Sequence, residues 1–186
     1  MKKFLKFIFS ISIIFFPINL NAEKNLLKLI NDIDANIIFV RHTLAPGFGD
    51  PQNFNIDNCN TQRNLNEEGR YHAKIIGNVF KKNNLIFSEI LSSEWCRCKE
   101  TTDLLNIGEW KTFGGLNSFF QKHSNKREVM KKLIDKIEKL DDNDFILMVT
   151  HLVVINEITG ISPSSGGIVL YNSKNKRAKV FNLKFN

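Results

Sequence analysis

The sequence predicts an α/β domain with three layers (α/β/α), in which helices cover both faces of a mostly parallel sheet. Two continuous apolar runs, Ile37–Val40 and Phe145–Val149, are typical of strands that are buried on both faces of such a sheet. Segments with helical periodicity alternate with the apolar runs, which is the pattern of strand–helix units. The length of 186 residues suits a single domain, which we assign to residues 23–186.

Each element follows from its own local pattern. Asn66 is a good helix N-cap, and Glu67 and Glu68 place negative charge in the first turn, where the helix dipole favours it. Apolar spacing predicts helices at 24–33, 66–82, 94–105, 127–140 and before Gly160, and strands at 37–40, 86–91, 145–149, 168–171 and 178–183. The segments 43–65 and 106–124 are irregular, and a loop as long as the first is usually functional.

Residues 1–22 have the layout of a secretory signal peptide. Lys2, Lys3 and Lys6 precede a mostly apolar stretch, and the small residue Ala22 stands at the expected cleavage point. The stretch is shorter than the roughly 20 apolar residues of a membrane-spanning helix. We therefore expect export to the periplasm or the cell exterior, without stable membrane insertion after cleavage. An uncleaved N-terminal anchor is the alternative.

The charge of the chain does not indicate a nucleic-acid partner. Cleavage would remove three of the 26 basic residues and none of the 19 acidic ones, so the net charge would fall from +7 to +4. The basic residues are spread along the chain, whereas a nucleic-acid binder usually clusters them. Cys59, Cys96 and Cys98 allow one disulfide in an oxidising compartment and lack a fourth ligand for a metal site. No metal or other cofactor is predicted.

Three of the predicted strands are followed by polar residues. These are Arg41 and His42 after the first strand, Ser92, Ser93 and Arg97 after the second, and Thr150 and His151 after the third. Ligands of open α/β sheets bind outside the carboxyl ends of the strands. We therefore expect His42, Arg97 and His151 to meet in one pocket.

The residue types in this pocket fit phosphoryl transfer. A neutral imidazole is a nucleophile, so His42 can take a phosphoryl group and later yield it to water. Arg41 and Arg97 carry planar guanidinium groups that match phosphate oxygens. His151 would add a hydrogen-bond donor as charge moves in the transition state. Any one of these residues alone could be structural, and their combination at the strand ends supports the hypothesis.

In these residues the chain resembles the histidine phosphatase superfamily, which has the phosphoglycerate mutase-like fold. The matching motifs stand in the family's order and span nearly the whole of the predicted domain: Phe39-Val40-Arg41-His42, Leu65-Asn66-Glu67-Glu68-Gly69-Arg70 with Ala73, Leu91-Ser92-Ser93 through Arg97 to Thr101, and Val149-Thr150-His151. The resemblance implies that His42 is the phosphorylated nucleophile. It also implies that Arg41, Arg97 and His151 form the phosphate pocket.

The chain departs from the family pattern at two places. Thr43 stands where the family usually has glycine, so its side chain would narrow the entrance or contribute a hydroxyl group. Many members carry a glutamate proton donor after the third core strand, but the segment 114–120 contains no carboxylate. Either Asp50 supplies the proton, or the substrate has a good leaving group, as phosphohistidine and anhydrides do.

The long irregular loop carries further candidates. Arg63 either lines the pocket or makes a structural ion pair. A disulfide from Cys59 to Cys96 or Cys98 would tie this loop to the helix that carries Arg97, if the geometry allows it. The residues predicted to contact the substrate are Thr43, Asp50, Arg63 and Asn117.

We therefore expect an exported, metal-independent phosphatase that acts on a phosphomonoester or on phosphohistidine. Its partner would be a phosphorylated small molecule, an envelope glycan or lipid, or a phosphoprotein, and not a nucleic acid. The alternative is a catalytically silent phosphate-binding module of the same fold. The missing carboxylate and Thr43 favour this alternative, whereas the complete set of two histidines and two arginines opposes it.

Overall fold

The computed structural model describes residues 20–183 and 185, with side chains from residue 26 onward. Residues 1–19, and with them most of the predicted signal peptide, lie outside this range. The first helix, α1, spans Leu20–Ile33 and so begins before the predicted cleavage point after Ala22. Among the described residues, no helix combines the length and the apolar character that crossing a membrane requires.

The core of the fold is a six-stranded sheet with the strand order β3-β2-β4-β1-β5-β6. The strands are β1 Ile37–Arg41, β2 Glu89–Ser92, β3 Lys111–Thr112, β4 Ile146–Thr150, β5 Ile168–Tyr171 and β6 Ala178–Phe181. Strands β3, β2, β4 and β1 run parallel, whereas β5 and β6 are each antiparallel to the preceding strand in the sheet. The predicted mostly parallel sheet is therefore confirmed.

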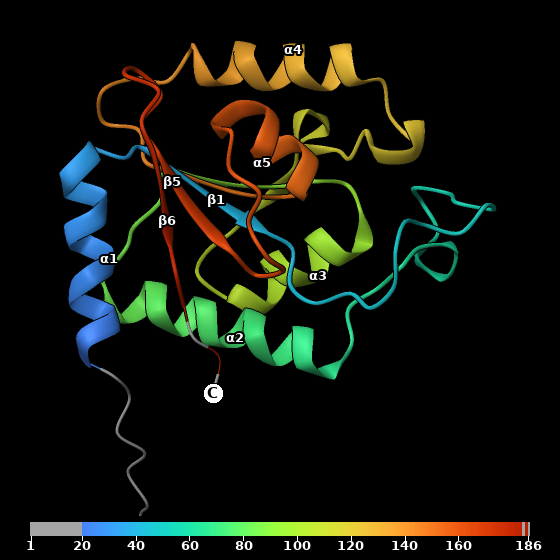
Figure 1. Cartoon of the computed structure of the whole chain (residues 1–186), viewed down its shortest axis with the longest axis horizontal. Coiled ribbons are helices and arrows are strands. Elements are labelled where there is room, and N and C mark those ends of the chain that lie inside the picture. The colour runs from blue at the N-terminus through green and yellow to red at the C-terminus, as the bar shows by residue number, and fades with distance from the viewer. Residues whose placement is uncertain (1–19, 184, 186) are drawn as a thin grey trace, which may run out of the picture.

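Helices cover both faces of this sheet, which confirms the three predicted layers (Figure 1). Besides α1, the helices are α2 Glu67–Lys82, α3 Cys96–Leu105, α4 Lys126–Ile137 and α5 Leu152–Thr159. Helices α1, α2 and α3 cover one face, where Phe80 and Leu105 share a core with Ile38. Helices α4 and α5 cover the other face, where Leu133 shares a core with Phe39. Successive side chains of β1 thus enter different cores, as the pleat of a strand requires.

Helix α2 holds the loop that follows β1. The side chain of its N-cap Asn66 accepts a hydrogen bond of 2.8 Å from the backbone N–H of Gly69, which confirms the predicted helix start. A Cβ atom at Gly69 would lie 2.2 Å from the carbonyl oxygen of Leu44. A larger residue at this position would push the loop away from the sheet edge, so the glycine fixes where the loop begins.

Several predicted segments differ from the structure in their bounds or in their type. The second strand begins at Glu89 rather than at residue 86, because Ile86 is 85% exposed and its apolar neighbours pack on the core as a loop. The segment expected to be irregular contains β3 and two 3₁₀ helices, η2 Gly114–Leu116 and η3 Phe120–Lys122. Another short 3₁₀ helix, η1 Cys59–Thr61, lies in the long loop.

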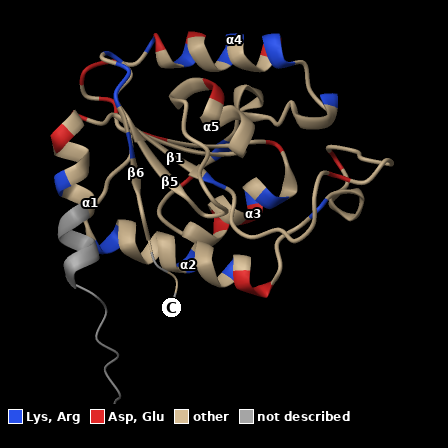
Figure 2. Ribbon diagram, in the orientation of Figure 1, with Lys and Arg blue, Asp and Glu red and all other residues tan. Residues whose placement is uncertain are grey.

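Residues of both charges occur along helices α2 and α4 (Figure 2). Helix α2 begins with acidic residues and ends with basic ones, which complements its dipole. On α4, Lys131 pairs with Asp135 one turn later. The charges on these helices therefore stabilise the helices themselves.

Candidate active site

The carboxyl ends of β1, β2 and β4 lie side by side at one edge of the sheet. The backbone N–H of His42 donates to the carbonyl of Thr150 at 2.9 Å, and that of Ser93 donates to the carbonyl of Val149 at 2.9 Å. The polar residues after the three strands therefore meet, as the sequence predicts. Four of them, Arg41, His42, Arg97 and His151, line a cavity of about 200 Å³ together with Asp50 and Arg63.

His42 lies on the inner wall of this cavity and is only 2% exposed. Its Nδ1 lies 2.9 Å from the backbone carbonyl oxygen of Thr43, which can only accept, so Nδ1 carries the proton. Nε2 then keeps a free electron pair, to which Nε of Arg97 donates at 3.2 Å. Burial, and after it the charge of Arg97, holds the pKa of His42 well below its usual value. His42 therefore has the protonation state of a nucleophile, with Nε2 as the available atom.

Arg97 is held by Asp50, from the loop after β1. The two terminal guanidinium nitrogens donate to the two carboxylate oxygens at 2.8 and 3.1 Å, and both side chains are 4% exposed. Asp50 also accepts from Nε1 of Trp95 at 3.1 Å and from the backbone N–H of Arg63 at 3.0 Å. Burial alone would raise the pKa of Asp50, but these hydrogen bonds and the charge of Arg97 hold it below its usual value. Asp50 is thus an ionised partner of Arg97 and is poorly suited to donate a proton, contrary to one of our two hypotheses.

His151 lies beside Arg97 and is fixed from behind by Ser93. The hydroxyl of Ser93 donates to Oδ1 of Asn117 at 3.1 Å, so its contact of 3.0 Å with Nε2 of His151 uses the proton of Nε2. Nδ1 then accepts a long hydrogen bond of 3.5 Å from Arg97. Burial, followed by the charge of Arg97, keeps the pKa of His151 well below its usual value. In this arrangement His151 positions Arg97, whereas we expected a hydrogen-bond donor to the phosphate.

Arg41 reaches the cavity from the end of β1. Its Nη1 donates to the carbonyl of Pro163 at 2.9 Å, whereas its buried Nε has no hydrogen-bond partner among the described residues. A buried donor without a partner is rare and costly in proteins. An anion bound by Arg41 would supply the missing acceptor, as would a water molecule.

Arg63 lines the cavity and clamps the loop around it. Its Nε donates to the carbonyl of Gly49 at 2.9 Å, and its Nη1 donates to the carbonyls of Ala45 and, at 3.2 Å, of Gly47. Of the two alternatives for Arg63, the structure favours cavity lining, with the guanidinium bound to backbone oxygens. Arg63 thus adds positive charge to the site and fixes the turn that carries Phe48.

Thr43 and Asn117, which we expected to contact the substrate, do not line the cavity. Thr43 is fully buried, and its hydroxyl lies 3.2 Å from that of Thr101, so it joins the end of β1 to α3. Asn117 lies behind Ser93, where it binds the carboxylate of Glu94 and accepts from the backbone N–H of that residue at 2.9 Å. Both side chains are short and satisfied inside the protein, so they support the site without forming its surface.

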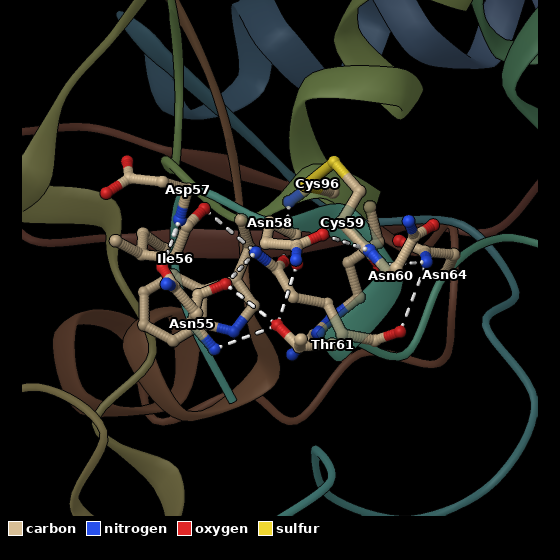
Figure 3. Close-up of a disulfide and its surroundings, with 12 residues drawn as sticks. Asn55, Ile56, Asp57, Asn58, Cys59, Asn60, Thr61, Asn64 and Cys96 are labelled. Atoms are coloured by element: carbon tan, nitrogen blue, oxygen red, sulfur yellow. Dashed lines mark hydrogen bonds between the residues drawn. A yellow bond between two sulfur atoms is a disulfide. The ribbon is translucent and has the colours of Figure 1, made fainter. Parts of the chain in front are cut away.

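A disulfide between Cys59 and Cys96 ties the long loop to the start of α3 (Figure 3). It confirms the predicted link and selects Cys96 over Cys98, a buried free thiol whose pKa is raised by burial to about 12. Beside the disulfide, Oε1 of Gln62 accepts from the backbone N–H of Cys96 at 2.9 Å. Arg97 follows Cys96 directly, so the disulfide anchors the loop next to the arginine that contacts His42.

Two phenylalanine rings of the cavity were not predicted from the sequence. Phe48 and Phe120 line it, and Trp95 is both a core residue and a hydrogen-bond donor to Asp50. A signal for Phe48 was present, because it stands between two glycines in a loop already marked as functional by its length. Phe120 lies in a segment without regular periodicity, and no local pattern singles it out.

The assembled site combines a neutral imidazole with concentrated positive charge. Arg41, Arg63 and Arg97 all act electrostatically on His42, and Asp50 neutralises one of these three charges. Within the described part of the chain, no group of three or more metal-ligating side chains is found. Guanidinium groups around a histidine suit a phosphoryl group, which offers several anionic oxygens.

Solved structures of similar shape identify the fold. The protein histidine phosphatase SixA in complex with tungstate has a TM-score of 0.52 at 15% identity, and the match covers 77% of this chain and 92% of SixA. The mycobacterial glucosyl-3-phosphoglycerate phosphatase has a TM-score of 0.52 at 12% identity, with 78% and 96% of the two chains covered. A mutant phosphoserine phosphatase from Entamoeba histolytica, in complex with phosphoserine, has a TM-score of 0.51 at 14% identity, with 78% and 94% covered.

These matches define the class of protein at the level of the fold. No protein-family model and no curated protein matches the sequence. The chain therefore has the fold that these proteins share, which confirms the fold that its motifs imply.

Proposed function

We propose that this protein is a metal-independent phosphatase that forms a phosphohistidine intermediate on His42. The observation that carries the proposal is the state of this residue, a buried neutral imidazole whose unprotonated Nε2 accepts a hydrogen bond of 3.2 Å from Nε of Arg97. The unpartnered Nε of Arg41, in the lining of the same cavity, supports an anionic substrate.

The reaction would take place in two displacements. In the first, the electron pair of Nε2 attacks phosphorus and a P–N bond forms, while the bond to the leaving group breaks with its electron pair on the leaving atom. In the second, water attacks phosphorus, the P–N bond breaks, inorganic phosphate leaves and His42 regains its electron pair. Arg41 and Arg97 would stabilise charge on the phosphoryl oxygens, and the Nδ1–H bond to Thr43 would keep the ring aligned.

The proteins of similar fold support a phosphorylated substrate. Their names describe phosphatases of protein histidine, of glucosyl-3-phosphoglycerate and of phosphoserine, which share only the phosphoryl group. For this chain we therefore propose a phosphorylated partner, which can be a small molecule, an envelope glycan or lipid, or a phosphoprotein.

One observation favours the alternative of a silent phosphate-binding module. The terminal nitrogens of Arg97, which could bind a phosphate, are both taken by Asp50. A phosphate group must displace this carboxylate or bind through Arg41 and the Nε atom of Arg97. Binding of inorganic phosphate without turnover of any phosphate ester is the behaviour that distinguishes the silent module.

Hydrolysis of an aryl phosphate by the full chain in the presence of a chelator tests the proposal. Wild-type protein should be active, and His42→Ala should lose activity by a factor of about a thousand or more, as expected when a covalent nucleophile is removed. His72→Ala is the matched control, because it removes a histidine of α2 that stacks on Phe185 outside the cavity and should retain activity. Equal activity of the wild type and His42→Ala would refute the proposal that His42 is the nucleophile.

We also propose that the protein is exported and loses residues 1–22. The disulfide between Cys59 and Cys96 fits an oxidising compartment. Because α1 begins at Leu20, cleavage after Ala22 would remove the start of this helix. N-terminal sequencing of protein recovered from the cell envelope or the medium should find Glu23 first, and an intact N-terminus would contradict cleavage.

A further inference from the structure

The cavity has polar groups at its inner end and apolar groups at its opening. His42, Arg97 and His151 are 2%, 3% and 3% exposed, whereas Phe48 is 88% and Phe120 39% exposed. The apolar residues of the lining are Phe48, Phe120, Leu152 and Val153. A ligand in this cavity therefore meets phosphate-binding groups at depth and aromatic rings at the opening, which we call the aromatic mouth (Phe48 and Phe120).

The two rings of the aromatic mouth are paired across the opening. Their centroids lie 5.2 Å apart with an interplanar angle of 84°, an edge-to-face arrangement. Phe48 lies between two glycines with φ angles of 93° and 69°, a conformation in which other residues are strained. The next residue but one, Asp50, donates its backbone N–H to the side chain of Gln121 at 2.8 Å. The turn with Phe48 and the segment with Phe120 are therefore linked to each other.

The segment that presents Phe120 is also held in an unusual conformation. Gln121 and Lys122 have φ angles of 57° and 63°, in the left-handed region that non-glycine residues rarely adopt. Strained backbone of this kind persists where the surrounding structure fixes it, and it concentrates at functional sites. The exposed aromatic pair is thus a fixed part of the cavity, unlike apolar residues scattered singly over a surface.

We propose that the substrate carries its phosphoryl group on an aromatic ring, which the aromatic mouth holds during the reaction. This inference rests on the proposed function, because an in-line displacement places the leaving atom opposite Nε2 of His42. His42 is buried, so the leaving group lies toward the exposed opening, where Phe48 and Phe120 stand. A planar ring there would stack on the phenylalanine rings or meet them edge-on.

The acid–base groups of the cavity favour the same substrate class. Among the described lining residues, the one carboxylate is Asp50, which accepts hydrogen bonds from Arg97, Trp95 and Arg63. No carboxyl group in the lining therefore protonates the leaving group as it departs. The rate is lowered most for substrates with poor leaving groups. An oxygen attached to an aromatic ring, or a nitrogen within one, is a better leaving atom than an alkyl oxygen, because the ring delocalises the negative charge that the leaving group acquires. When the bond from phosphorus to the ring atom breaks, the pair stays on that atom and water supplies its proton.

Phosphonates are not hydrolysed, so their binding tests the aromatic mouth separately from the reaction. Calorimetry on the full chain should give phenylphosphonate a dissociation constant about tenfold lower than that of methylphosphonate, from the usual strength of aromatic pairs. In the double variant Phe48→Ala/Phe120→Ala this ratio should fall to about one. Ile86→Ala is the matched control, because it removes an apolar side chain of similar exposure (85%) outside the cavity lining and should keep the ratio.

Hydrolysis then tests the leaving group. The wild-type kcat/KM should be at least about a hundredfold higher for phosphotyrosine or phosphoimidazole than for phosphoserine, and the better of the two identifies the ring atom as oxygen or nitrogen. A preference for phosphoserine, or a phosphonate ratio that the double variant leaves unchanged, would overturn the inference even if His42 is the nucleophile. Hydrolysis that survives His42→Ala would overturn the proposed function, and intact phosphonate discrimination in that case would still establish the aromatic mouth as a binding site.

Discussion

The contribution of the disulfide between Cys59 and Cys96 to the stability of the protein can be predicted from the loop that it closes. The two cysteines are 37 residues apart in the sequence. In the chain-entropy treatment of cross-links, closing a loop of this length restricts the unfolded chain by about 4 kcal/mol at 25 °C. We therefore expect Cys59→Ala/Cys96→Ala to lower the free energy of unfolding by about 4 kcal/mol relative to the oxidised wild type.

Urea unfolding followed by circular dichroism measures this loss. Dithiothreitol should destabilise the wild type by a similar amount and should leave the double variant unchanged. Cys98→Ala is the control, because it removes the buried free thiol and should keep the full response to reductant. A loss below about 1 kcal/mol would refute the reasoning, because it would mean that the unfolded chain is restricted to the same extent without the cross-link.

Four further predictions concern the site. The kcat for an aryl phosphate should stay nearly constant as the pH is lowered from about 8 through 6.5, because burial and Arg97 hold the pKa of His42 well below 6.5. A decrease of kcat on the acid side that is centred near pH 6.5 would contradict this prediction. The lowered pKa of His42 also predicts that the free energy of unfolding decreases as the pH is lowered from 6.5. Below this pH the histidines of the unfolded chain bind protons, whereas the buried ring of His42 does not. A free energy of unfolding that is independent of pH in this range would contradict the prediction. Thr43→Val should cost about 1 kcal/mol in urea unfolding, because it removes the hydroxyl contact with Thr101, yet change kcat/KM by less than about threefold; a larger change would place the side chain in the site. Asp50→Asn should lower the dissociation constant of inorganic phosphate in calorimetry, because Arg97 loses its anionic partner, and weaker binding would contradict the competition between carboxylate and phosphate.

The residues at the strand ends could be predicted because parallel strands bury both faces. Continuous apolar runs mark such strands, and parallel neighbours place their carboxyl ends at one edge. The register of β1 on β4 puts Arg41 beside Thr150, so His42 and His151 were placed together correctly without any knowledge of the loops. The helix start at Asn66 was predictable for a different reason, because a cap is a local hydrogen bond.

The roles of the loop residues depend on contacts that no local pattern encodes. Asp50 and Arg97 lie far apart in the sequence, and only the folded loop shows that they form a bidentate ion pair. The same holds for Thr43, whose hydroxyl turns to Thr101 in α3 and away from the cavity. The position of a residue at a strand end is set by the sheet, whereas the position of a residue in the long loop is set by tertiary packing, which outweighs local preference.

The ion pair between Asp50 and Arg97 determines how this site can treat a phosphoryl group. A buried arginine without a counter-ion is strongly destabilising, so the carboxylate supplies a charge that the fold needs. Asp50 takes the two terminal nitrogens of Arg97 and leaves Nε directed at Nε2 of His42. A phosphoryl group on Nε2 can therefore contact Nε of Arg97 without breaking the ion pair, whereas free phosphate could occupy the terminal nitrogens of Arg97 only by displacing Asp50. Such a site would hold the group in transfer more firmly than the released product, which is what turnover requires of a phosphatase.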